Sequence, residues 1–87
     1  MSIEATAAPT TMSLAVHTWF ADYMRRRGVR LTKDLWAVGP SKTYDSPCGL
    51  VYAIRAESAE AAVDAWCKML DIEDRDTYAP IAYRMVA

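Results

Sequence analysis

Residues 58–70 read SAEAAVDAWCKML, and this segment decides the fold. Ser58 is a typical N-cap residue, because its hydroxyl can accept a hydrogen bond from a free amide of the first helical turn. The residues after it place apolar side chains at the three- and four-residue spacing of one helical face: Ala59, Ala62, Val63, Trp66, Cys67 and Leu70. Asp64 and Lys68 can form an ion pair one turn apart on the opposite face. The pattern predicts an amphipathic helix over residues 59–70.

The segments on either side of this helix alternate in the manner of strands. Residues 50–55 (LVYAIR) and 81–86 (IAYRMV) each place every second side chain on the same face. Pro80 ends the charged segment that precedes the second of them. A strand, helix, strand unit is expected to have parallel strands, either adjacent or separated by a third strand.

The N-terminal half predicts one more helix and the third strand. From residue 12 onward one helical face carries Val16, Trp19, Phe20, Tyr23 and Arg27, widened by Leu14 and Met24. Thr11 or Ser13 can cap the start of this helix, and Gly28 can take the left-handed position after its last turn. The β-prone run 35–38 (LWAV), closed by a Gly-Pro pair, predicts a strand.

The predicted fold class is therefore α+β in the order α-β-β-α-β, a three-stranded sheet with two helices packed on one face. The helices are expected to bury Trp19, Phe20, Val63 and Trp66 against the sheet. The other face would then expose apolar side chains, and a homodimer or another partner is expected to cover it. Residues 1–11 are predicted to be a flexible N-terminal arm, and residues 12–87 a single domain.

Composition excludes several classes of protein. The 87 residues are 53% hydrophobic with a net charge of −1, which is incompatible with intrinsic disorder of the body of the chain. No apolar run approaches the roughly 18 residues of a membrane-spanning helix, so no membrane contact is expected. Without a secretory signal and with two cysteines best interpreted as thiols, we expect a cytoplasmic location in a bacterial host.

No stretch carries a catalytic, metal or nucleotide signature. Cys48, Cys67 and His17 are far apart and form no pair with metal-ligand spacing. We therefore predict no cofactor, no metal and no catalytic residues. An enzyme that uses Cys48 as nucleophile with His17 as base ranks last, because a lone cysteine and a lone histidine are usually packing residues.

Charge is segregated along the chain. Residues 25–42 hold six cations against one acid, a balance of +5, and residues 57–76 hold seven acids against two cations, a balance of −5. The predicted basic patch comprises Arg25, Arg26, Arg27, Arg30 and Lys33 together with Trp36. The predicted acidic patch comprises Asp64, Asp71, Glu73, Asp74 and Asp76.

Each patch has a functional and a structural interpretation. The basic patch can bind phosphates while Trp36 stacks a base, or its arginines can simply complement a helix C-terminus. The acidic patch can meet a basic surface of a protein partner, or it can be a solvated helix face. The near-neutral total favours a protein partner over nucleic acid.

One local resemblance bears on function. Residues 54–66 (IRAESAEAAVDAW) resemble the strand, A-x-S-x-x-x-A capped turn and helix of small phage and mobile-element proteins, including anti-CRISPR inhibitors. The resemblance implies a non-enzymatic protein that occupies a functional surface of a bacterial defence complex, such as a nucleoprotein, often with acids placed where nucleic acid would sit. We therefore expect a small inhibitory protein-binding module. The alternative is a nucleic-acid-binding accessory protein that uses the cluster Arg25–Arg30.

Overall fold

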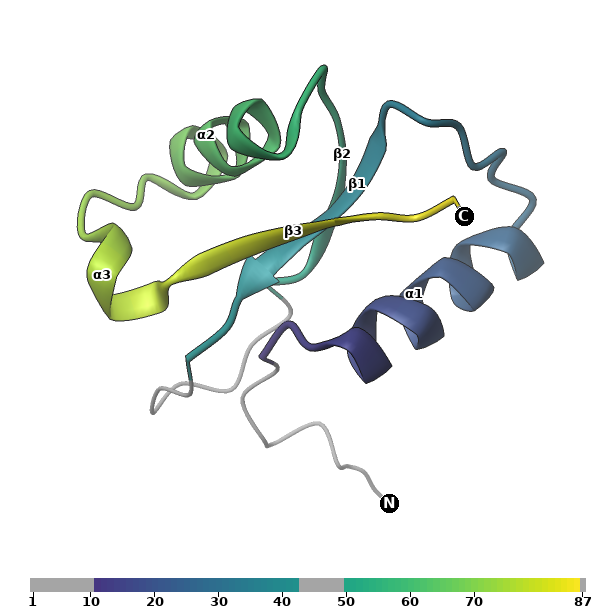
Figure 1. Cartoon of the computed structure of the whole chain (residues 1–87), viewed down its shortest axis with the longest axis horizontal. Coiled ribbons are helices and arrows are strands. Elements are labelled where there is room, and N and C mark those ends of the chain that lie inside the picture. Colours follow the sequence, from purple (N-terminus) through teal and green to yellow (C-terminus); the bar gives the residue numbers. More distant parts are fainter. Residues whose placement is uncertain (1–10, 43–49, 87) are drawn as a thin grey trace.

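The computed structural model describes residues 11–42 and 50–86. Within these ranges the chain forms an α+β fold in the predicted order α-β-β-α-β, with a short extra helix before the last strand (Figure 1). The elements are α1 (Leu14–Arg26), β1 (Leu35–Pro40), β2 (Tyr52–Arg55), α2 (Ala59–Leu70), α3 (Arg75–Tyr78) and β3 (Pro80–Arg84). The predicted N-terminal arm, apart from Thr11, lies outside the described residues, as does Cys48.

The sheet has the strand order β2-β1-β3, and β1 pairs antiparallel with both neighbours. Trp36 of β1 lies opposite Ile54 of β2 and Arg84 of β3. Because β2 and β3 both run opposite to β1, they are parallel to each other. Of the two arrangements expected for the strand, helix, strand unit, the chain adopts the one with another strand in between.

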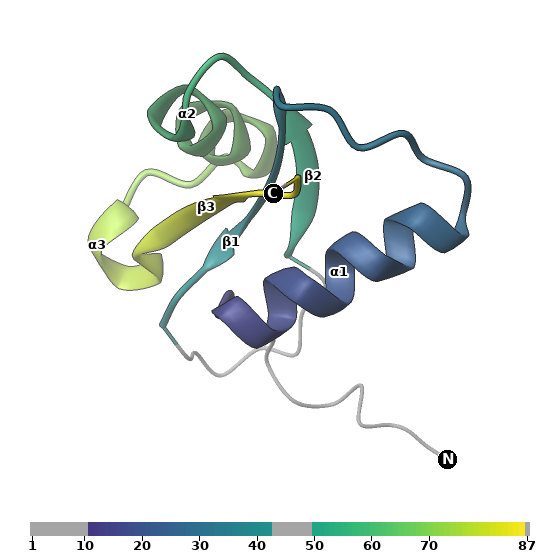
Figure 2. The ribbon, with the colours of Figure 1, turned by 45° about the vertical axis from the view of Figure 1, so that its right-hand side comes forward.

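The central strand β1 is buried along its whole length. Trp36 and Val38 pack with α2, whereas Leu35 and Ala37 pack with α1. The two long helices therefore lie on opposite faces of the sheet (Figure 2), and the prediction that both pack on one face is wrong. The reason is that the LWAV run is apolar at successive positions, so both faces of the strand must be covered. The face for which a homodimer was expected is covered by α1.

Helix α2 has the predicted bounds and the predicted inward face. The Ser58 hydroxyl accepts a hydrogen bond from the Ala61 amide at 3.1 Å, and Asp71 ends the helix in the left-handed region. All six residues of the predicted stripe belong to one apolar cluster with Trp36 and Val38. Trp66 is fully buried, and its indole Nε1–H donates to the Leu50 carbonyl at 2.7 Å.

Helix α1 begins as predicted but is rotated relative to the predicted face. The Ser13 hydroxyl accepts from the Val16 amide at 3.3 Å, and Gly28 after the helix has a φ of 83°. The buried residue of α1 is Ala21, around which Val16, Phe20 and Met24 pack. The prediction that Trp19 is buried is wrong, since this side chain is 63% exposed. With Ala21 in the centre of the inward face, Trp19 lies at the edge of the contact with the core.

Candidate functional site

The cations of the predicted basic patch gather at the end of α1 and in the loop that follows it. Arg25, Arg26, Arg27, Arg30 and Lys33 are all exposed. Arg26 forms an ion pair with Asp22 one turn earlier, with 2.9 Å between its Nη2 and the carboxylate Oδ2. The other four form no ion pair with any residue that the structure describes. The guanidinium of Arg27 lies over the ring of Tyr23, whereas the charges of Arg25, Arg30 and Lys33 are directed to solvent.

Trp36 does not belong to this patch. Its side chain is only 7% exposed and lies on the α2 face of the sheet, because it occupies an α2-facing position of the central strand. The indole Nε1–H donates to the Ala56 carbonyl at 2.9 Å, and the Arg84 guanidinium lies 4.8 Å from the ring centre. The prediction that Trp36 stacks a base is therefore corrected.

Two other aromatic rings of α1 stand beside the arginines. Trp19 is 63% exposed and Tyr23 is 40% exposed, and their rings stack 5.6 Å apart with an interplanar angle of 16°. The Arg27 guanidinium lies 5.4 Å from the centre of the Tyr23 ring. These three residues follow one another at four-residue spacing and form one strip along the helix, here called the aromatic–arginine strip. Phe20 stacks on both rings and joins the strip to the core.

Sequence reasoning missed this strip because it assigned Trp19 to the core and placed Tyr23 on the same apolar face of the helix. The signal was present in the same segment, since Asp22 and Arg26 lie on the helical face next to these rings. A helix with apolar residues over more than half of its circumference cannot bury them all against one sheet. The apolar side chains that the sheet does not cover are therefore exposed at the surface.

The predicted acidic patch is partly occupied by contacts within the chain. The Asp64 carboxylate forms an ion pair with Arg75, with 2.6 Å between Oδ1 and Nη1. Asp74 caps α3, where it accepts from the amide of Thr77 at 3.3 Å and from the hydroxyl of Thr77 at 2.5 Å. The hydrogen bond from the Thr77 hydroxyl is the main cause of a lowered pKa of Asp74.

The remaining acids of this patch lie around the end of α2 and in α3. Asp71 adopts the left-handed conformation that ends α2, and Glu73 and Asp76 are exposed. Lys42, which follows β1, donates from Nζ to the backbone carbonyl of Asp76 at 3.1 Å. The structure therefore brings a cation of the basic half of the sequence onto the acidic segment.

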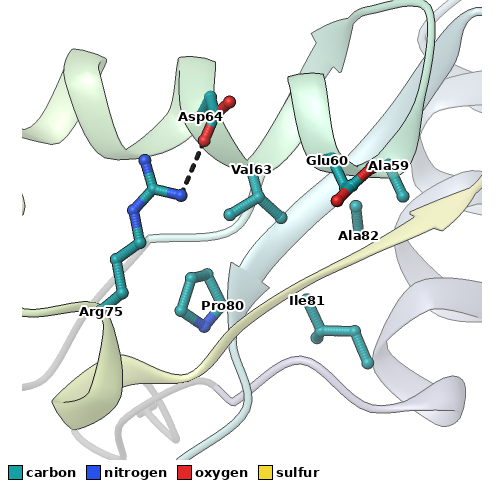
Figure 3. A pocket seen from close by; sticks show the side chains of 8 residues that line it. All are labelled: Ala59, Glu60, Val63, Asp64, Arg75, Pro80, Ile81 and Ala82. Carbon is teal, nitrogen blue, oxygen red and sulfur yellow. Dashed lines mark ion pairs between the residues drawn. The ribbon is translucent and has the colours of Figure 1, made fainter.

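A cavity of about 380 Å³ opens between α2 and β3 (Figure 3). Its lining residues are Ala59, Glu60, Val63 and Asp64 of α2, Arg75 of α3, and Pro80, Ile81 and Ala82 of β3. The walls are mostly apolar, and the Asp64–Arg75 ion pair closes one end. Among these residues, only Asp64 was predicted as a site residue.

His17 has a packing role. Its ring stacks on Tyr83 with 5.0 Å between centres, and its Nε2 lies 2.8 Å from the Arg84 carbonyl, to which it donates. The Nδ1 atom is buried and has no hydrogen-bond partner in the described part of the chain. Because Cys48 lies outside that part, no contact between His17 and this thiol is described.

The described residues contain no group of three or more His, Cys, Asp or Glu side chains placed to hold a metal ion. None of the helices within 11–42 and 50–86 is long and apolar enough to span a membrane. Comparisons with known protein families, with curated proteins and with solved structures found no match. The candidate function therefore depends on the geometry of the chain itself.

Proposed function

We propose that the protein is a non-enzymatic binding module that docks on an acidic surface of a protein partner through the aromatic–arginine strip. The observation that carries this proposal is the exposure of Trp19, at 63%, on the outward side of α1. Trp, Tyr and Arg are the residue types that contribute most to binding free energy at protein interfaces. Here Trp19 and Arg27 each contact the ring of Tyr23, so these side chains lose little further conformational freedom on binding.

The surrounding charge supports an acidic partner. Arg25, Arg26, Arg30 and Lys33 lie at the same end of α1 as Arg27, against the single acid Asp22 of the helix. Such a cluster accelerates association with an acidic surface and discriminates against basic ones. The resemblance to small phage inhibitors extends the proposal: the partner belongs to a nucleic-acid-handling or defence complex of a bacterial host.

The proposal is tested by affinity capture from bacterial lysate with three forms of the protein. These are the wild type, the variant Trp19→Ala/Arg27→Glu, and the control Tyr52→Ala, which removes an exposed ring of β2 on another part of the surface. A partner retained in stoichiometric amount by the wild type and the control, in the presence of nuclease, should be lost by the strip variant. Retention by all three forms would contradict the proposal.

Nucleic acid is the second candidate partner, because exposed rings beside arginines are also a stacking platform for bases. The overall charge of −1 counts against it. Fluorescence anisotropy with single-stranded DNA separates the two functions. A nucleic-acid binder should lose affinity steeply with added salt, and that dependence should flatten when Arg25, Arg26, Arg27 and Arg30 are replaced with Ala.

A further inference from the structure

Strand β3 has an open outer edge. The Met85 amide donates to the Leu35 carbonyl at 3.2 Å. This hydrogen bond identifies which residues of β3 direct their backbone groups toward β1. In an antiparallel ladder every second residue directs its backbone groups to the neighbouring strand. Ile81 and Tyr83 therefore bond to β1, and the amide and carbonyl of Ala82 point away from it. The Arg84 amide points in the same outward direction.

One end of this edge is already closed. The outward carbonyl of Arg84 accepts the hydrogen bond from Nε2 of His17, so α1 covers the strand from that point on. The groups that stay open are the Pro80 carbonyl, both backbone groups of Ala82 and the Arg84 amide. No hydrogen bond from any described residue reaches them. An unpaired stretch of this kind is a template for an additional strand.

The cavity between α2 and β3 lies along this open edge. Three consecutive residues of β3, Pro80, Ile81 and Ala82, line it, although neighbouring side chains of a strand alternate between the two faces of the sheet (Figure 3). Ala59 and Ala82 leave space, and Val63 and Pro80 supply apolar walls. At about 380 Å³ the cavity is near the lower end of the roughly 300–1,000 Å³ range of ligand pockets.

The charged residues that line the cavity indicate which kind of side chain can bind in it. Asp64 is neutralised by Arg75, whereas Glu60 forms no ion pair within the described part of the chain. A free carboxylate at the rim of an apolar recess fits a long aliphatic side chain with a cationic end. Lysine has such a side chain, since its stem can pack on Val63 while its ammonium group reaches Glu60.

We propose that an extended segment of a partner protein adds as a fourth strand to β3 and inserts a lysine side chain into this cavity beside Glu60. Backbone hydrogen bonds to Ala82 and Arg84 supply the pairing, and the cavity supplies the selectivity, as in other complexes formed by strand addition. A second copy of the chain fits less well. Antiparallel pairing of two β3 edges places the two α2 helices side by side on one face, with their acids facing each other.

The test uses the acetylated and amidated peptide Thr-Val-Lys-Val-Thr, titrated to about 1 mM into ¹⁵N-labelled protein, a concentration at which weak complexes are detected. We expect the amide resonances of Ala82 and Arg84 to shift and their hydrogen exchange to slow. The counterpart peptide with Glu in place of Lys should bind about tenfold more weakly. Absence of binding, or equal binding of both peptides, would overturn the proposal.

Proline variants at the two sheet edges provide matched controls. Ala82→Pro removes an outward amide of β3 without removing a bond to β1, a position where proline is tolerated. Ala53→Pro does the same on the outer edge of β2, because the bond from the Ala56 amide to the Asp34 carbonyl makes Ala53 an outward residue. Binding should be lost in Ala82→Pro and retained in Ala53→Pro. The reverse result would place the peptide on β2.

The Glu60→Gln variant tests the cavity separately from the edge. Lysine-peptide affinity should fall about fivefold while the shifts at Ala82 persist. Concentration-dependent shifts without peptide would show that a second copy occupies the edge, and this would overturn the proposal. Because Trp19→Ala/Arg27→Glu changes neither β3 nor α2, failure of either proposal can be told apart from failure of the other.

Discussion

At the scale of single residues, the three tryptophans occupy three different environments. Trp66 is fully buried on the inward face of α2, Trp36 is buried in the central strand with Arg84 over its ring, and Trp19 projects from α1 with 63% exposure. The buried pair each donate an indole hydrogen bond to a backbone carbonyl. Burial with a satisfied N–H is the usual state of a core tryptophan, so Trp19 is the one that needs a functional explanation.

Replacing Trp66 and Trp19 with Phe should separate these roles. Trp66→Phe leaves a void and removes the donor of the Leu50 carbonyl, so the free energy of unfolding should fall by about 2–4 kcal/mol. Trp19→Phe should change it by no more than about 0.5 kcal/mol, as expected for an exposed position. Urea denaturation measures both. A larger loss for Trp19→Phe than for Trp66→Phe would contradict the assigned burial.

The contribution of the Asp74 carboxylate to stability is expected to depend on pH. The Thr77 hydroxyl lowers the pKa of Asp74 in the folded chain, so its stabilising effect is complete above the unfolded pKa and is lost as the pH falls through the folded value. The Tm difference between wild type and Asp74→Ala should therefore be constant near neutrality and shrink below about pH 4. Calorimetry at several pH values checks this, with Glu73→Ala as the control. A difference that grows on acidification would contradict the cap.

At the scale of elements, β1 lies close to the residue that precedes β2, and the approach is at a glycine. A Cβ added to Gly39 would lie 2.9 Å from Cγ2 of Val51, which is closer than van der Waals contact allows. Gly39→Ala should therefore lower the free energy of unfolding by about 1–3 kcal/mol through overpacking. Val51→Ala removes the clashing methyl group, so the double variant should be more stable than the sum of the two single effects by about 1 kcal/mol. An additive double-mutant cycle would show that residues 39 and 51 are not in this contact.

The two long helices differ in how well the sequence predicted them. Helix α2 has apolar residues on one side and acids on the other, so only one orientation buries the former and solvates the latter. Helix α1 carries apolar rings on two adjoining sides, and several rotations bury a similar area. In the rotation that the chain adopts, Ala21 packs in the core and the aromatic–arginine strip lies on the surface.

At the scale of the whole molecule, the helices enclose the sheet from both sides (Figure 2). Neither face of the described sheet is then left for a second copy of the chain to cover. Antiparallel pairing of two β3 edges is opposed by repulsion between the acids of the two α2 helices. We expect the chain to be monomeric, with a mass of 9.7 kDa by light scattering over a range of protein concentrations. A dimer at low concentration would contradict the inferred coverage of the sheet or the charge argument at β3.

The sequence by itself determined the fold class, the order of the elements, and the N-cap and inward face of α2, and it narrowed the N-cap of α1 to Thr11 or Ser13. These features depend on local spacing, capping chemistry and charge, all of which act within a few residues. Only the tertiary structure decided that the helices lie on opposite faces, that Trp36 is buried and Trp19 exposed, and that a cavity borders β3. The sheet has too little area to cover every apolar side chain of the helices. Packing between residues that are distant in the chain therefore decides which of these side chains are buried.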